Sequence, residues 1–203
     1  MAGAVGQSQK REMKNPLRQQ MRERLQKITA PVLEQFSAQA CELLRNQPIW
    51  QNAKSVLFYA PLPNEVDIWP LVSEALSENK SVAIPGFDAE ENSYVARQIK
   101  NLETDLDRGQ FGIREPKPNC PEISLNHLDL ALVPGLGFDL AGRRLGRGKG
   151  FYDRLLVQIS GTKCGVGFDE QIIEAIPIEP HDVHLNCILT PTRWHEVTSP
   201  REV

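Results

Sequence analysis

The sequence predicts an α/β fold: a single domain with a mostly parallel central sheet and helices on both faces, as in a Rossmann-like three-layer sandwich. Three observations favour this class. The chain has 203 residues, 40% of them apolar, which fits one ordinary domain better than two. Short apolar runs alternate with amphipathic segments, and this alternation of strand and helix is typical of parallel sheets. The runs are largely apolar throughout, as in strands buried on both faces.

The first part of the chain is predicted to be helical after a short head. Residues Met1–Met13 lack the apolar stretch of a secretory signal, and we expect them to be a mobile head. Helices are predicted over Pro16–Ile28 and Pro31–Arg45, because each begins with a proline, which suits a first helical turn. The domain proper is therefore expected to cover residues 14–203.

The remainder is predicted to form the sheet and its covering helices. Strands are expected over four runs: Ser55–Ala60, Ser81–Pro85, Leu128–Val133 and Lys163–Phe168. Helices are expected at Ile68–Glu78 and Phe151–Ile159, which have apolar residues at helical spacing. Such a sheet binds its ligands beyond the carboxyl ends of its strands. Three loops are candidates for that edge: Pro61–Asp67, Pro134–Gly150 and Pro177–Asn186.

Composition narrows the function classes. The formal net charge of -3 argues against a protein that coats nucleic acid, and no apolar stretch is long enough to span a membrane. The four cysteines are far apart and form no CxxC pair, which argues against a zinc cluster or a redox motif. We expect reduced structural thiols and a cytoplasmic protein.

One loop has the composition of a phosphate-binding site. Gly146, Gly148 and Gly150 alternate with Arg147 and Lys149 between a predicted strand and a predicted helix. Glycine lets the backbone approach an anion closely, and the cationic side chains reach its charge. The beginning of the following helix would add unpaired N–H groups. The pattern predicts phosphate binding, although a solvated turn would have the same composition.

Acidic residues near this loop have two interpretations each. Asp153, in the first turn of the predicted helix, is either a partner of the helix dipole or a ligand of Mg²⁺ beside a polyphosphate. Asp182 is either a second oxygen ligand or an ordinary turn residue. Its neighbours His181 and His184 lack a nearby third ligand, which favours surface histidines over a zinc site.

At this point the residues resemble a known family, the 5-formyltetrahydrofolate cyclo-ligases. The run Pro134–Asp153, PGLGFDLAGRRLGRGKGFYD, resembles the family signature over its whole length. Shorter similarities follow in the same order along the chain: Lys14 and Arg18 in the first helix, Asn64–Asp67, Gly112–Pro116 and His181–Val183. The resemblance covers nearly everything after the head.

The resemblance implies conversion of 5-formyltetrahydrofolate, which could be polyglutamylated, to 5,10-methenyltetrahydrofolate, with ATP hydrolysed to ADP and phosphate. It also implies catalytic roles for Lys149 and Arg147, Mg²⁺ ligation by Asp153 and Asp182, and a folate contact by Glu65. Further residues are implied as an ATP site: Lys14, Arg18, Arg144, Leu145, Gly146, Arg147, Gly148, Lys149, Gly150, Phe151 and Tyr152. Those implied to contact the folate besides Glu65 are Tyr59, Arg147, Gly148, Lys149, Gly150 and Tyr152.

Two positions depart from the family pattern. Gly86 follows Pro85 where a basic residue is common, and Asn186 stands where an acid is frequent. Gly86 cannot supply the cationic contact to phosphate or folate that the family pattern suggests at this position. Asn186 lies in the loop Pro177–Asn186, which could therefore hold metal or nucleotide differently.

Other functions remain open from the sequence. A sugar-phosphate isomerase-like enzyme would need the anion loop without ATP, and a catalytically silent nucleotide or folate binder would keep the site without turnover. A nucleic-acid-binding module could use the patch Arg143–Lys149, but the acidic chain predicts only weak association. We therefore expect a monomer that binds folate and ATP, and neither nucleic acid nor membrane.

Overall fold

The computed structural model describes residues 2–88, 93–109, 112–148, 150–179 and 182–198, with the backbone alone described for residues 2–12. The predicted α/β fold is confirmed. Seven strands form the central sheet, in the order β11-β10-β9-β6-β1-β2-β3. The four inner pairings are parallel and the two outer ones, β2 with β3 and β10 with β11, are antiparallel.

The elements have the following bounds. The helices are α1 (Ala2–Leu25), α2 (Ala30–Arg45), α3 (Pro48–Asn52), α4 (Trp69–Ser77) and α5 (Phe151–Leu156). The sheet strands are β1 (Ser55–Leu57), β2 (Ser81–Asp88), β3 (Ser93–Ile99), β6 (Leu130–Pro134), β9 (Thr162–Val166), β10 (Cys187–Leu189) and β11 (Trp194–Glu196). Two small hairpins lie apart from it, β4 (Leu106–Arg108) with β5 (Arg114–Pro116), and β7 (Gly137–Phe138) with β8 (Arg144–Leu145).

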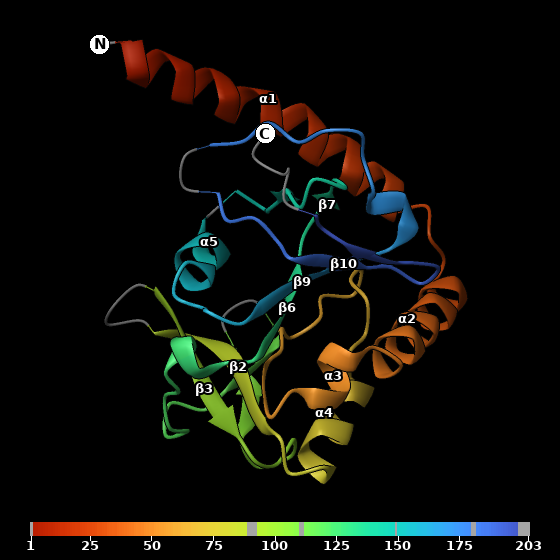
Figure 1. Ribbon diagram of the computed structural model, residues 1–203, viewed down its shortest axis with the longest axis vertical. Helices are drawn as coiled ribbons and strands as arrows, with labels where there is room; N and C mark the ends of the chain where they lie inside the picture. The colour runs from red at the N-terminus through yellow and green to blue at the C-terminus, as the bar shows by residue number, and fades with distance from the viewer. Residues whose placement is uncertain (1, 89–92, 110–111, 149, 180–181, 199–203) are drawn as a thin grey trace.

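Side chains that alternate along the strands build two separate cores. Val56, Val82 and Leu132 belong to a cluster with residues of α1, α2 and α4, whereas their neighbours Leu57 and Ala83 belong to a cluster with α5. Successive side chains of a strand point to opposite faces, so both faces of the sheet are buried. Figure 1 shows the resulting layers, with α2, α3 and α4 on one side of the sheet and α5 on the other.

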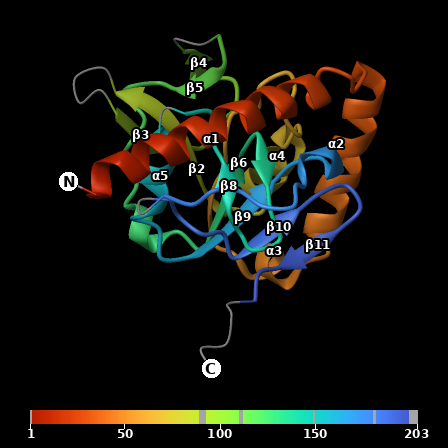
Figure 2. The same ribbon diagram turned by 90° about the horizontal axis from the view of Figure 1, so that it is seen from above.

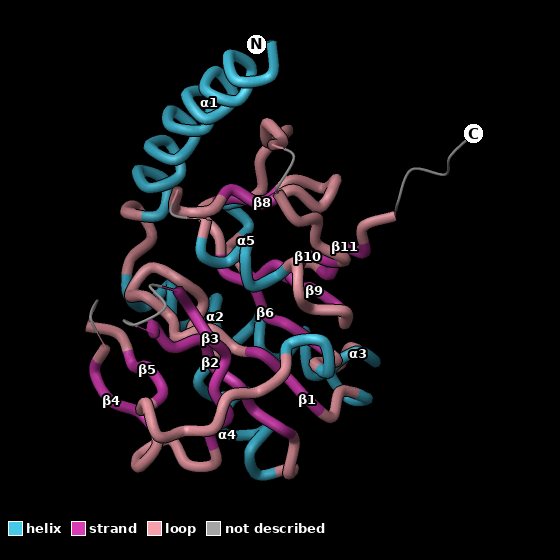
Figure 3. Tube along the Cα trace, turned by 90° about the vertical axis from the view of Figure 1, so that its left-hand side faces the viewer, coloured by secondary structure: helices cyan, strands magenta, loops and turns pink. Residues whose placement is uncertain are grey.

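The first helix differs from the prediction. It begins at Ala2 rather than Pro16 and ends at Leu25, so Pro16 lies inside it. Proline lacks the N–H that would bond to the preceding turn, which costs about 3 kcal/mol inside a helix, so other contacts must anchor this one. Met21 and Leu25 supply the anchor, since both are buried in the core. Residues 2–13 are thus helical, and Figure 3 shows the first turns extending away from the rest of the molecule; their mobility stays a prediction.

Three strands of the sheet were not predicted. β3 is only partly buried, and β10 and β11 have three residues each. β2 also continues beyond its predicted end at Pro85 to Asp88. Past Ala83 it pairs only with β3, so Pro85 lies where β1 needs no hydrogen bond from it.

None of the described helices combines the length and the apolar character that a membrane crossing requires.

Candidate functional site

The three predicted loops meet at the carboxyl edge of the sheet. Glu65 of the first loop and Arg147 of the second form an ion pair, with 2.7 Å between Oε1 and Nη2. The second and third loops are both contacted by the first helix, the second through Arg18 and Gly146 and the third through Lys14 and Asp182. The expectation that these loops gather at one place is therefore confirmed.

Helix α1 closes the site from a fourth direction. Lys14 and Arg18 lie one turn apart, so they share a face of the helix. Lys14 Nζ lies 2.6 Å from Asp182 Oδ2, and Arg18 donates from Nε to Gly146 O at 3.0 Å. In Figure 2, α1 runs across the molecule over β8, the strand that leads into the phosphate loop. The two cations expected to reach the site from the first helix do reach it.

The phosphate loop has the open backbone that its glycines predict. Gly148 and Gly150 have φ values of 104° and 66°, in the region that favours glycine. Arg147 and Gly148 are exposed. Lys149, the residue with the largest predicted role, lies outside the described residues. Helix α5 has only six residues, so the contribution expected from its dipole is smaller than the sequence suggested.

Asp139, which was not singled out from the sequence, shapes this loop. It is 1% exposed, and its carboxylate accepts hydrogen bonds from the backbone N–H of Ala141 and Arg143 at 3.0 Å. Its second oxygen accepts from Ile176 N–H at 2.8 Å, which ties the loop to the segment before Asp182. An Asp with a glycine three residues later is typical of a turn, but the long-range partner of Asp139 is not visible in the sequence.

Three residues predicted to touch ligands are buried. Tyr59 is 1% exposed and its hydroxyl donates to Val66 O at 2.8 Å, so it supports the Glu65 loop from below. Arg144 is 8% exposed, and its Nη2 lies 2.7 Å from Asp153 Oδ1. Arg144 therefore holds Asp153 in this structure, and its contact with ATP stays a prediction. Leu145 is fully buried as well.

The Glu65 carboxylate carries a negative charge close to Tyr59, Tyr152 and Arg147. Burial raises the pKa of Tyr59 and Tyr152, and the negative charge of Glu65 raises both further, which places both hydroxyls within its field. Glu65 itself accepts from Leu62 N–H through Oε2 at 3.0 Å and from Arg147 through Oε1. Its side chain is 8% exposed, so a ligand donor that reaches it meets a desolvated carboxylate.

A cavity of about 740 Å³ opens beside Glu65. Its walls come from α2, the loop after β1, the start of α4 and the turn before β5. Leu33, Leu62, Trp69 and Ile113 give it an apolar lining, and Arg45, Glu65 and Arg114 give it charged points. Predominantly apolar walls with a few polar groups are typical of small-molecule sites, and the volume falls within their usual range.

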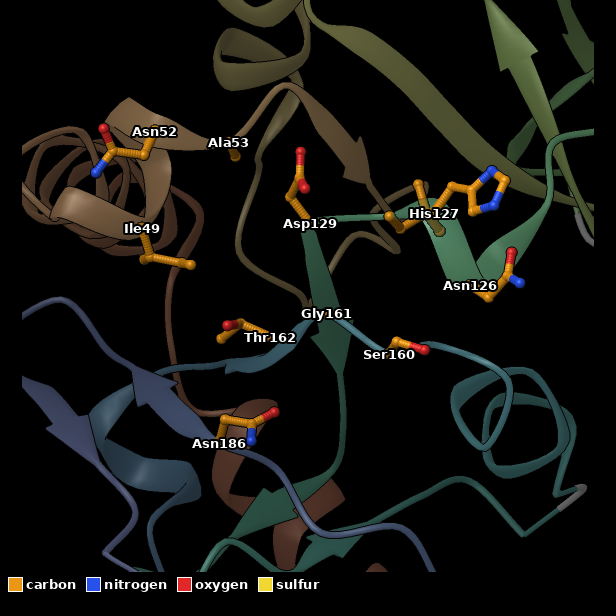
Figure 4. A pocket seen from close by; sticks show the side chains of 11 residues that line it. Ile49, Asn52, Ala53, Asn126, His127, Asp129, Ser160, Gly161, Thr162 and Asn186 are labelled. Atoms are coloured by element: carbon orange, nitrogen blue, oxygen red, sulfur yellow. The ribbon is translucent and has the colours of Figure 1, made fainter.

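A second hollow of about 750 Å³ lies at the opposite, amino edge of the sheet. Figure 4 shows Asn52, Asp129 and Asn186 around Gly161 in this hollow. Asp129 is bonded to the backbone N–H of Lys54 and Ser55, and Asn186 Oδ1 accepts from Lys163 N–H. These contacts are structural. Asn186 therefore lies at the amino edge of the sheet, and we expect its departure from the family pattern to have little effect on the site at the carboxyl edge.

The other departure, Gly86, lies within β2 rather than in a loop. A Cβ placed there would meet Pro116 at 3.6 Å, an ordinary van der Waals contact. The glycine is thus not required by packing, and the site lacks a cation from this position.

The proposed metal ligands are each held by a cation. Among the described residues, the bonds to Asp182 use Oδ2 and the bond to Asp153 uses Oδ1, which leaves one oxygen of each carboxylate for a metal. Mg²⁺ takes one or two protein carboxylates and completes its shell with water and phosphate, so these donors fit it. Within the described part of the chain, no group of three or more His, Cys, Asp or Glu side chains could hold a metal ion. His181 lies outside the described residues.

Comparisons with known proteins agree with this geometry. A family model described as the 5-formyltetrahydrofolate cyclo-ligase family matches residues 10–191. A 5-formyltetrahydrofolate cyclo-ligase of Mycolicibacterium smegmatis is 35% identical over 147 residues, 70% of this chain and 76% of its own. One of Haemophilus influenzae is 32% identical over 185 residues, 87% of this chain and 99% of its own.

A solved structure is similar over nearly the whole chain. The NMR structure of Aquifex aeolicus 5,10-methenyltetrahydrofolate synthetase matches with a TM-score of 0.82 and 30% identity, covering 94% of this chain and 96% of that one.

Proposed function

The chain belongs to the 5-formyltetrahydrofolate cyclo-ligase family and converts 5-formyltetrahydrofolate to 5,10-methenyltetrahydrofolate, and we propose that the site at the carboxyl edge of its sheet performs this reaction. The family is ATP-dependent. One observation carries the assignment of the site. The ion pair between Arg147 and Glu65 joins the phosphate loop to the acid that matches the family's folate contact.

The folate occupies the cavity beside Glu65. A pterin presents adjacent amino and ring N–H donors, and a carboxylate is their natural acceptor. The apolar walls formed by Leu62, Trp69 and Ile113 suit the flat rings of the substrate. Tyr152 is partly buried with its hydroxyl in the field of Glu65, which supports a place for its ring at the boundary between folate and phosphate.

The phosphates of ATP lie on the loop from Gly146 to Gly150. Arg147 and Lys149 compensate their charge, while the glycines let the backbone approach. Arg18 contributes from α1, where it already contacts the loop at Gly146. Lys14 and the remaining residues of the predicted ATP site are assigned by the family motif.

The chemistry requires a better leaving group at the formyl carbon. The formyl oxygen attacks the γ-phosphorus, the bond from that phosphorus to the β–γ bridging oxygen breaks, and ADP departs. N10 then bonds to the formyl carbon and loses its proton, and phosphate leaves with the former formyl oxygen to give the methenyl cation. Such phosphoryl transfer depends on positioning and charge compensation, which Arg147 and Lys149 supply.

Asp153 and Asp182 would hold Mg²⁺, whose charge offsets that of the phosphate oxygens when it is bound. Arg144 keeps Asp153 in place through its 2.7 Å contact, and Lys14 does the same for Asp182.

We propose further that the protein is a monomer in the cytoplasm. All four of its cysteines are buried and free, as is usual in a reducing compartment.

The test compares Lys149→Ala and Arg147→Ala with Arg193→Ala, an exposed arginine that pairs with Asp169 elsewhere. Both loop variants should lower kcat/KM for ATP by about a hundredfold, since each removes a charge-assisted contact to phosphate. Arg193→Ala should leave it unchanged. Normal kinetics in both loop variants, with folding verified by circular dichroism, would contradict the assignment of the loop.

A further inference from the structure

Glu179 is a buried acid at the site to which neither the sequence pattern nor the reaction assigns a role. It lies between the short helix Asp169–Gln171 and β10, and its side chain is 9% exposed. Its Oε1 lies 2.9 Å from Nζ of Lys14, which is itself 4% exposed. Buried charges of this kind are retained only when they are paired, so the contact fixes both groups.

Glu179 also holds Asp182 through the backbone. Its N–H donates to Asp182 Oδ2 at 2.7 Å, and Asp182 N–H donates back to Glu179 O at 3.0 Å. Two hydrogen bonds thus join Glu179 to Asp182, and the carboxylates of both residues share the ammonium of Lys14. Asp182, with a side chain 18% exposed, is the more open of the two acids.

The two acids face different tasks when ATP binds. A metal held by the other oxygen of Asp182 would draw on the charge of this carboxylate and would repel the nearby ammonium of Lys14. Without a second acid, a buried lysine beside that metal would lose its counter-charge. The Glu179 carboxylate supplies this counter-charge to Lys14.

We propose that Glu179 is a positioning residue that keeps Lys14 in place while Asp182 engages the metal and nucleotide. This inference rests on the proposed function. Through Lys14, Glu179 also keeps α1 docked, so that Arg18, one turn further along, stays on Gly146 of the phosphate loop. Glu179 acts through these groups and does not itself touch the reacting atoms.

The test uses Glu179→Gln and Glu179→Ala, with Glu174→Gln as the matched control because Glu174 is an exposed acid of the same segment. Glu179→Gln keeps an acceptor for Lys14 but removes the charge. We expect it to raise KM for ATP by about tenfold with a much smaller change in kcat, and Glu179→Ala to raise KM further. KM for 5-formyltetrahydrofolate should stay the same.

Two readouts separate this role from mere stability and from the reaction itself. Hydrogen exchange of the backbone amides over residues 14–25 should become faster in both Glu179 variants and unchanged in Glu174→Gln. In a Lys14→Met background, Glu179→Gln should change ATP affinity, measured by calorimetry, by less than it does alone. Wild-type exchange in α1 together with full additivity in that cycle would overturn the proposal.

The calorimetric and exchange experiments need no turnover. A protein that binds ATP but forms no methenyl product would contradict the proposed function and still report on Glu179.

Discussion

Arg147 and Glu65 form an ion pair with each other, although the proposed function uses Glu65 for folate and Arg147 for the phosphates of ATP. If the two residues have the proposed roles, a pterin that donates to Glu65 would displace Arg147, and the released guanidinium would then be available to phosphate. Folate binding should therefore strengthen ATP binding, and by linkage ATP should strengthen folate binding by the same factor.

A double-mutant cycle tests this coupling. Arg147→Ala and Glu65→Gln should each reduce the effect of folate on ATP affinity, and the double variant should show no larger loss than the more affected single variant. We expect the wild-type coupling to be about fivefold or more, the lower end of common allosteric effects. Calorimetry with and without 5-formyltetrahydrofolate measures it. Independent binding of the two ligands to the wild-type protein would contradict the shared contact.

Arg144 and Asp153 form a second ion pair, and the structure predicts the effect of breaking it on stability and turnover. The Arg144 side chain is 5% exposed, and its guanidinium also lies 5.7 Å from the ring centroid of Tyr152. Arg144→Met should lower the free energy of unfolding by about 2 kcal/mol, because it leaves the Asp153 carboxylate, which is 18% exposed, without its partner. It should lower turnover as well, since Asp153 is then unheld.

Urea unfolding of Arg144→Met and of Arg154→Ala provides the comparison, since Arg154 is an exposed arginine of α5, the helix that contains Asp153. Equal stability of the two variants would argue against the buried pair.

The sequence predicted the identity of these residues better than their partners. The resemblance pointed to Glu65 and Arg147, but they are 82 residues apart, and nothing local predicts their contact. Tyr59 and Arg144 were expected at the ligand because they belong to, or flank, the right segments. Which side of a strand or hairpin a side chain takes depends on tertiary packing, and packing buried both.

At the scale of elements, α1 contributes to the site through its second half. Its described contacts begin with Lys14 and continue through Arg18 to Met21 and Leu25 in the core. Removal of residues 1–13 should therefore leave kcat and both KM values within about twofold of those of the full chain, as for changes away from such contacts. Steady-state kinetics of the shortened protein checks this. A loss of activity of tenfold or more would show that the first turns of the helix contribute to the site.

The elements that the sequence predicted well are the helices with apolar residues at helical spacing and the inner strands with continuous apolar runs. The cores of α2, α4, β1, β6 and β9 fall within one to three residues of their expected bounds. The edge strands β3, β10 and β11 escaped because they are short or half-exposed, so their composition carries little signal. The start of α1 was misplaced because Pro16 is a favourable first-turn residue, and the long helix tolerates it in its interior.

At the scale of the whole molecule, the two edges of the sheet have different tasks. Every predicted site residue that the structure describes lies on or beneath the carboxyl edge or on the part of α1 that faces it, whereas the hollow at the amino edge is lined by structural contacts. The fold therefore concentrates the chemistry on one side, as expected of a parallel sheet.

Asn186 tests this division, because the family often has an acid there and the structure places it at the amino edge. Asn186→Asp keeps the oxygen that accepts from Lys163 N–H, so the fold should be unaffected. KM for ATP and the dependence of turnover on Mg²⁺ should remain within about twofold of the wild type. A marked change in the Mg²⁺ requirement would place this residue in the site instead.

The most direct measurement is the absorbance of methenyltetrahydrofolate in a mixture of purified protein, 5-formyltetrahydrofolate, ATP and Mg²⁺. Each component is omitted in turn, and Lys149→Ala serves as the loop control. The account predicts product only when all components are present, with much slower formation by the variant. Folded protein that binds ATP but forms no product, or forms it equally fast without ATP, would contradict it.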